Sequence, residues 1–166
     1  MQLASSIITA VSTLFAVGIT LFFTNRRERS KFILDLNLKE YIDLETFYIN
    51  LLSSIEKAKS YTTQGEDYKE LFNEISILSA KANLISTDLI NRQLNAVSDV
   101  LYEWSSLYRK SLPTKVGNTG LGIVSNIDLE FRDRANELYP KLFDEIQELV
   151  KLIKQELNNQ KKKLKR

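Results

Sequence analysis

The 166-residue chain contains no cysteine and no histidine. Their absence excludes disulfides, zinc sites built from thiolates and imidazoles, cysteine nucleophiles and histidine general bases. A Ser-His-Asp triad is excluded for the same reason. The sequence also lacks a phosphate-binding Walker motif, a nucleophile elbow and a Ca²⁺-binding loop. We therefore expect a protein that is not an enzyme, without catalytic residues, a cofactor or a bound metal.

Glycine and proline are also scarce, with five and two residues respectively. Because tight turns between strands depend on these residues, their scarcity favours long helices. A hydrophobic content of 43% and a charged content of 27% are typical of folded chains. The net charge of +2 is too small to indicate nucleic acid as a partner. The composition therefore predicts an all-α protein that does not bind nucleic acid.

The N-terminal segment from Leu3 to Phe23 contains no charged residue. As an α-helix it is about 31 Å long, which matches the ~30 Å hydrocarbon core of a bilayer. A cleaved signal peptide is one alternative, but it needs basic residues ahead of the apolar stretch, and Met1 and Gln2 have no charged side chain. A buried core helix is the other alternative. We predict a transmembrane anchor over residues 1–25, with Leu3 to Phe23 as the span.

Basic residues follow this segment but do not precede it. Those behind the span, which we call the basic collar, are Arg26, Arg27, Arg29 and Lys31. Basic flanks stay in the cytoplasm, so we expect the N-terminus outside and the C-terminal domain cytoplasmic, at the inner (cytoplasmic) membrane. A basic tail over 161–166 contains Lys161, Lys162, Lys163, Lys165 and Arg166. Both clusters are predicted to face membrane lipids, with a solvated helix end as the alternative for the tail.

Within the span, Ser12, Ala16 and Thr20 recur every four residues. Small residues at this spacing allow two membrane helices to approach closely. Self-association of the span through these three residues, giving a homo-oligomer, is therefore a hypothesis.

Residues 26–160 show helical periodicity. We predict an antiparallel bundle of about four helices over roughly 28–63, 66–85, 87–110 and 125–160, with a glycine-rich loop at 111–122. The first helix can continue from the span, because no glycine or proline lies between Thr24 and Gln64. Its predicted buried stripes consist of Leu34, Leu38, Tyr41, Tyr48, Leu52 and Ile55, and of Ile33, Leu44, Phe47, Leu51 and Ala58.

Several residues predict helix boundaries. Ser86 is the expected N-cap of the third helix, and the alternative is that the second and third helices are one kinked helix. Ser125 and Asp128 have the spacing of a capping box. Pro140 predicts a kink or a break near Tyr139. The acid pairs Glu70/Glu74 and Asp133/Glu137 are better explained as solvated faces than as metal ligands, and Trp104 as a core residue.

Two functions follow from this organisation, whose layout resembles that of many small bacterial membrane proteins. The first is a membrane-anchored module for protein interaction or self-assembly, which docks an unknown protein partner. The alternative is a small membrane-perturbing effector or toxin whose Ser/Thr-rich span oligomerises into a pore. We favour the first, because a cytoplasmic domain of this size is more than a pore former needs.

Overall fold

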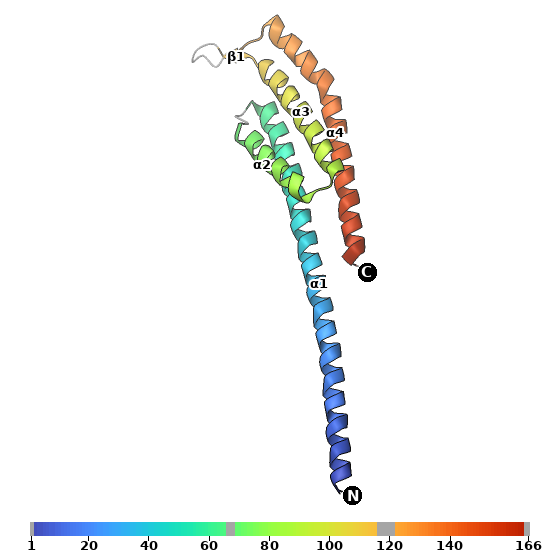
Figure 1. Cartoon of the computed structure of the whole chain (residues 1–166). Coiled ribbons are helices and arrows are strands. Elements are labelled where there is room, and N and C mark those ends of the chain that lie inside the picture. The colour runs from blue at the N-terminus through green and yellow to red at the C-terminus, as the bar shows by residue number, and fades with distance from the viewer. Residues whose placement is uncertain (1, 66–68, 116–121, 165–166) are drawn as a thin grey trace.

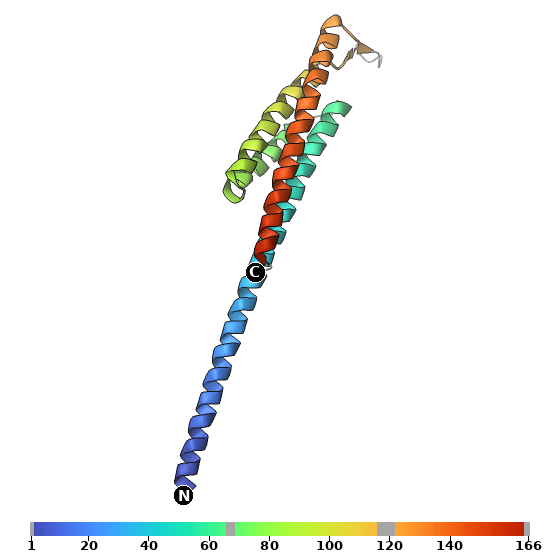
Figure 2. The same ribbon diagram turned by 90° about the vertical axis from the view of Figure 1, so that its right-hand side faces the viewer.

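The computed structural model describes residues 2–65, 69–115 and 122–164, and the side chains of 17–65, 70, 72–113 and 122–164. Its four helices are α1 (Gln2–Gln64), α2 (Lys69–Ile85), α3 (Asp88–Lys110) and α4 (Asn126–Leu164). Successive helices run antiparallel, and α2, α3 and α4 pack around the C-terminal part of α1 (Figures 1 and 2). The predicted all-helical bundle is confirmed.

Helix α1 is one unbroken helix of 63 residues. At 1.5 Å per residue it is about 95 Å long. It ends at Gln64 and is followed by Gly65, whose φ of 73° is left-handed and whose N–H donates to the Thr62 carbonyl at 3.2 Å. Glycine adopts this conformation without a steric penalty, so it suits the position that follows the helix.

Among the side chains that the structure describes, no helix combines the length and the apolar character needed to cross a membrane. Of the predicted span Leu3 to Phe23, the side chains of residues 3–16 lie outside the described residues. The transmembrane assignment therefore stays a prediction.

The core lies where all four helices meet. Its α1 residues repeat at helical spacing, and the largest fully buried side chain is Trp104 on α3, which packs against Tyr108 and Tyr139. The core is formed by Phe47, Tyr48, Leu51, Ile55, Ala58, Ile75, Ala82, Ile90, Leu94, Val97, Val100, Leu101, Trp104, Leu107, Ala135, Leu142, Ile146, Leu149 and Ile153. The prediction of Trp104 as a core residue is thus confirmed.

The predicted buried stripe of α1 is wrong at its N-terminal end. Ile33, Leu34 and Leu38 are all about half exposed. The reason is the length of the returning helix: α2 has 17 residues and covers α1 only back to about residue 44. Periodicity shows which face of a helix is apolar, but not how far the neighbouring helix extends.

Helices α2 and α3 are separate, and Thr87, not Ser86, is the N-cap of α3, without a side-chain cap hydrogen bond. The capping box at the start of α4 is confirmed: the Asp128 N–H donates to Ser125 Oγ at 3.2 Å, and the Ser125 N–H donates to Asp128 Oδ2 at 2.7 Å. The prediction at Pro140 is wrong as regards a break, since α4 continues through it.

The predicted loop contains two short strands, β1 (Thr114–Lys115) and β2 (Gly122–Ile123), which pair antiparallel. The residues between them, 116–121, lie outside the described residues. This hairpin lies at the end of the bundle farthest from the N-terminus (Figure 1).

Leu51 and Ile77 provide a test of this packing. Leu51 is fully buried, so Leu51→Ala should lower the free energy of unfolding by about 2–5 kcal/mol, from lost burial and a cavity. Ile77 is 71% exposed, and Ile77→Ala should change it by less than about 1 kcal/mol. Thermal unfolding of the full chain in mild detergent, followed by circular dichroism, measures both. Equal losses would contradict the bundle.

Candidate interaction groove at the base of the bundle

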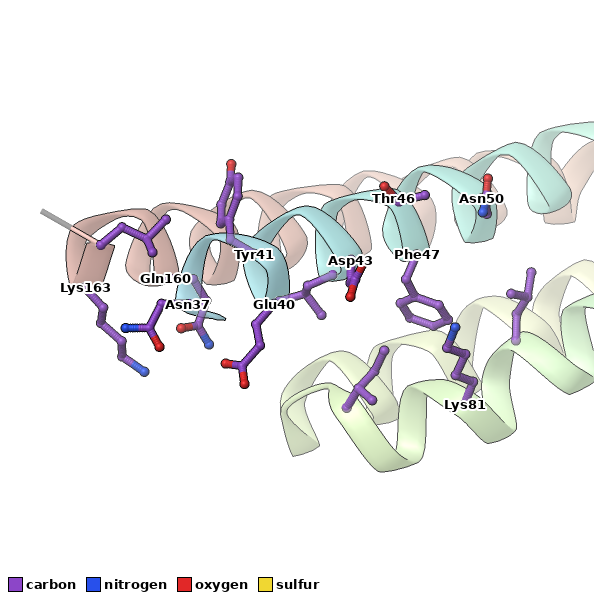
Figure 3. Close-up of a pocket in the computed structure, with 14 residues that line it drawn as sticks. Asn37, Glu40, Tyr41, Asp43, Thr46, Phe47, Asn50, Lys81, Gln160 and Lys163 are labelled. Atoms are coloured by element: carbon purple, nitrogen blue, oxygen red, sulfur yellow. The ribbon is translucent and has the colours of Figure 1, made fainter. Parts of the chain in front are cut away.

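A groove of about 870 Å³ opens at the end of the bundle nearest the N-terminus, between α1, the last turns of α2 and the end of α4 (Figure 3). Because α2 stops short and α4 ends here, α1 is covered only in part. We call this the basal groove. It is lined by Asn37, Glu40, Tyr41, Asp43, Leu44, Thr46, Phe47, Asn50, Leu78, Lys81, Ile85, Gln160, Lys163 and Leu164.

The groove combines an apolar floor with charges of both signs. Phe47 and Leu78 belong to the core and its packed margin, and the Lys81 ammonium lies 5.4 Å from the centre of the Phe47 ring. Glu40 and Asp43 extend from α1 beside Phe47, and Lys163 approaches from α4 (Figure 3). An apolar strip flanked by opposite charges suits an amphipathic helix or an extended peptide.

The described part of the chain contains no cluster of three or more acidic residues that could hold a metal ion. The basal groove presents hydrogen-bonding amides, two carboxylates and two ammonium groups around an apolar floor.

A partly buried hydrogen-bond node lies beside the groove and joins three parts of the bundle. The Tyr48 hydroxyl of α1 donates to Glu156 Oε2 of α4 at 2.5 Å. It lies 3.0 Å from Ser86 Oγ in the α2–α3 connection. Because a tyrosine has one hydroxyl proton, and the carboxylate can only accept, the Ser86 hydroxyl donates to Tyr48. Ser86, the expected N-cap, thus takes part in a tertiary contact instead.

This node affects the ionisation of Tyr48. Burial raises the pKa of Tyr48 far above its ordinary value, and the Glu156 carboxylate raises it further by accepting the hydrogen bond and by repelling a phenolate. The Ser86 hydroxyl opposes this to a smaller extent. Tyr48 therefore stays a neutral donor at physiological pH and holds α1 and α4 together.

Other polar contacts fix the same helices. Ser54 of α1 donates to Glu74 of α2 at 2.9 Å. Gln93 of α3 donates to both the carbonyl and the carboxylate of Glu145 on α4, at 2.9 and 2.6 Å. These contacts cross between helices at partly buried positions, where a hydrogen bond is worth more than at the surface. They link α1 to α2 and α3 to α4 in the bundle that forms the groove.

The structure places the predicted basic residues at two heights along α1. The basic collar is exposed on α1 below the bundle. Lys161, Lys162 and Lys163 lie on the exposed end of α4, which reaches the level of Asn37 and Tyr41, and Lys165 and Arg166 lie outside the described residues. The side chains of Ser12 and Ala16 also lie outside them, whereas Thr20 is described on α1.

The chain matches no protein-family model, no curated protein and no solved structure.

Tyr48→Phe tests the node. Loss of the hydroxyl should lower the free energy of unfolding at pH 7 by roughly 1.5 kcal/mol, the low end for hydrogen bonds to charged groups, because Glu156 is only half-buried. The pKa of Tyr48 is higher in the folded state, so its contribution is complete below its unfolded pKa of about 10 and is lost as the pH rises further. The difference between wild type and variant should therefore shrink above pH 10. Urea unfolding at several pH values measures it, with Tyr102→Phe, an exposed tyrosine, as control. A constant difference would contradict this role of the hydroxyl.

Proposed function

We propose that the protein is a single-pass membrane-anchored module that presents its helical bundle, and the basal groove, to a protein partner on the cytoplasmic side. The observation that carries this proposal is the continuity of α1. One helix without a break joins the charge-free segment Leu3 to Phe23 to the core of the bundle. The anchor and the binding surface are therefore parts of one rigid element.

The position of the basic collar supports the proposed orientation. Arg26 to Lys31 lie three to eight residues beyond Phe23, or about 5–12 Å along the helix axis. The headgroup region adds only about 5–8 Å on each side of the hydrocarbon core. The four basic side chains would thus lie at the lipid surface, where each gains about 1 kcal/mol from an anionic leaflet.

The basic tail lies farther from the predicted membrane surface than the basic collar. The end of α4 lies beside Asn37, about 21 Å beyond Phe23 along α1. With α1 upright, that is more than 10 Å outside the headgroups, and the Debye length is about 8 Å. Lipid attraction of Lys161–Lys163 is then mostly screened. The collar, and not the tail, would contact lipids, while Lys163 would contribute to the basal groove.

This geometry defines the space available to a partner. Between Phe23 and the basal groove, α1 stands free of the other helices for about 20 Å, roughly two helix diameters. A partner helix could enter the groove from this space. A built groove on a bundle of this size favours the interaction module over the pore-forming alternative, which needs little besides the span.

Two arginines in the segment Leu3 to Phe23 test the anchor. Val11→Arg combined with Leu14→Arg should cost about 6 kcal/mol at the centre of a membrane helix and release the protein from carbonate-washed membranes. Exchanging the two residues, Val11→Leu with Leu14→Val, keeps the composition and should leave the protein in the membrane pellet.

The orientation of the protein in the membrane is tested with a cysteine variant in cells. Because the chain has no cysteine, Ser53→Cys provides a single exposed thiol on the bundle. A membrane-impermeant maleimide should label it only after the cells are permeabilised. Release of the wild-type chain by carbonate, or labelling in intact cells, would contradict the proposal.

The basal groove is tested by photo-crosslinking in cells. A photoreactive residue in place of Asp43, which extends into the groove, should give an adduct of one defined mass (Figure 3). The same residue in place of Glu103, exposed on α3, is the control. The purified partner should then bind the wild-type chain and bind Asp43→Lys at least several-fold more weakly. Equal adducts at both sites, or equal binding, would exclude the groove as the docking site.

A further inference from the structure

The free part of α1 is apolar on nearly all sides just above the basic collar. Phe32, Ile33, Leu34, Leu36 and Leu38 are 46–69% exposed. Helices that are apolar all round are normally buried. An isolated stretch of this length is also marginally stable in water, because most helices depend on packing. This part of α1 therefore has the character of a segment that packs against something else.

One stripe of these residues points away from the bundle. Ile49 is 61% exposed although its neighbours Phe47, Tyr48 and Leu51 are at most 3% exposed, so it lies on the outer face of α1. Seven residues back, on the same face, lies Ile42, and further turns bring Leu38 and Leu34. We call Leu34, Leu38, Ile42 and Ile49 the outer stripe. Beyond Ile49 this face becomes polar with Ser53, Glu56 and Ser60, so the stripe has a defined end.

We infer that the outer stripe packs against the outer stripe of a second copy, with the two α1 helices parallel and in register. This inference rests on the proposed anchor, which gives all copies the same direction and brings the same residues to the same height. The bundles then lie on opposite outer sides of the pair. None of the four stripe residues lines the basal groove, so the contact does not obstruct it.

Charge and position support a second copy over an unrelated partner. Lys31 lies within the outer stripe, while Glu28, Asp35 and Lys39 lie along one edge of it, and the signs of these four charges alternate along the helix. The ion pairs Lys59–Glu56 and Lys151–Glu148 lie elsewhere. In a parallel pair, charges offset by about one turn have opposite signs. Leu34 also lies fourteen residues, almost four whole turns, from Thr20, so the outer stripe continues the face of α1 that carries Thr20.

The area that the outer stripe could bury indicates whether the pair forms in solution or only in a membrane. Each stripe side chain leaves on the order of 100 Å² in water, so four give roughly 400 Å² per copy, about half of the ~800 Å² per partner in a stable interface. Glu45 lies between Ile42 and Ile49, so in a parallel pair it would face Glu45 of the second copy. The repulsion between the two carboxylates would weaken the contact further. Detached bundles should therefore remain monomeric, and the pair needs the concentration and alignment that a shared membrane provides.

Disulfide cross-linking in membranes tests the inference, because each introduced cysteine is the sole thiol. Leu38→Cys and Ile42→Cys should give a dimer on oxidation at least five-fold more efficiently than Leu36→Cys. Leu36 is as exposed as Leu38 but lies about 200° around the helix. Equal yields at 36 and 38, or no dimer at 38 and 42 in protein retained by the membrane, would overturn the inference. Loss of the protein from the membrane would instead refute the anchor.

A second variant tests dimer formation without introduced cysteines. Leu38→Glu combined with Ile42→Glu should reduce the dimer captured by a lysine-reactive cross-linker in membranes at least five-fold. Ile77→Glu, on the exposed face of α2, should leave it unchanged. All three positions are exposed in the single chain, and circular dichroism checks that each variant is folded. An undiminished dimer in the double variant would overturn the inference.

Discussion

The whole architecture depends on the hydrogen-bonded continuity of α1. A helix satisfies its backbone groups internally, so it can pass from one solvent to another without a break. Only its side chains change along its length: uncharged to Phe23, mostly basic to Lys31, mostly apolar to Leu38, and amphipathic from there to Gln64. Every surface described here is a consequence of where along this helix the other three pack.

The three shorter helices cover one side of α1 and only its C-terminal part. Buried residues from α2, α3 and α4 meet Tyr48, Leu51 and Ile55, and the node of Tyr48, Glu156 and Ser86 closes the core near its lower edge. Where the covering helices end, α1 remains half-covered, and this produces the basal groove. The groove is therefore a direct result of the unequal lengths of the helices and is held by the same contacts that hold the bundle.

Local sequence patterns predicted what depends on local physics. Helical periodicity and few glycines and prolines indicated the four-helix bundle, and Ser125 with Asp128 indicated the start of α4. They could not distinguish Leu38 from Leu51, since both lie in predicted apolar stripes, whereas Leu38 is about half exposed on the outer side of α1 and Leu51 is fully buried. The Tyr48–Glu156 contact, between residues 108 apart, and the groove formed by three helices were likewise beyond sequence patterns.

The two exposed surfaces of α1 fit one mode of action. The basal groove lies on the side that faces α2 and α4, and the outer stripe lies on the opposite side. Two copies paired through the outer stripe would keep both grooves open, at equal height and with parallel axes. A partner with two binding segments, or a paired partner, would then engage both grooves. The second binding event would become intramolecular. A partner with modest affinity for each groove would then be retained strongly at the membrane. Pairing through α1 would thus increase binding at the grooves without any change in their residues.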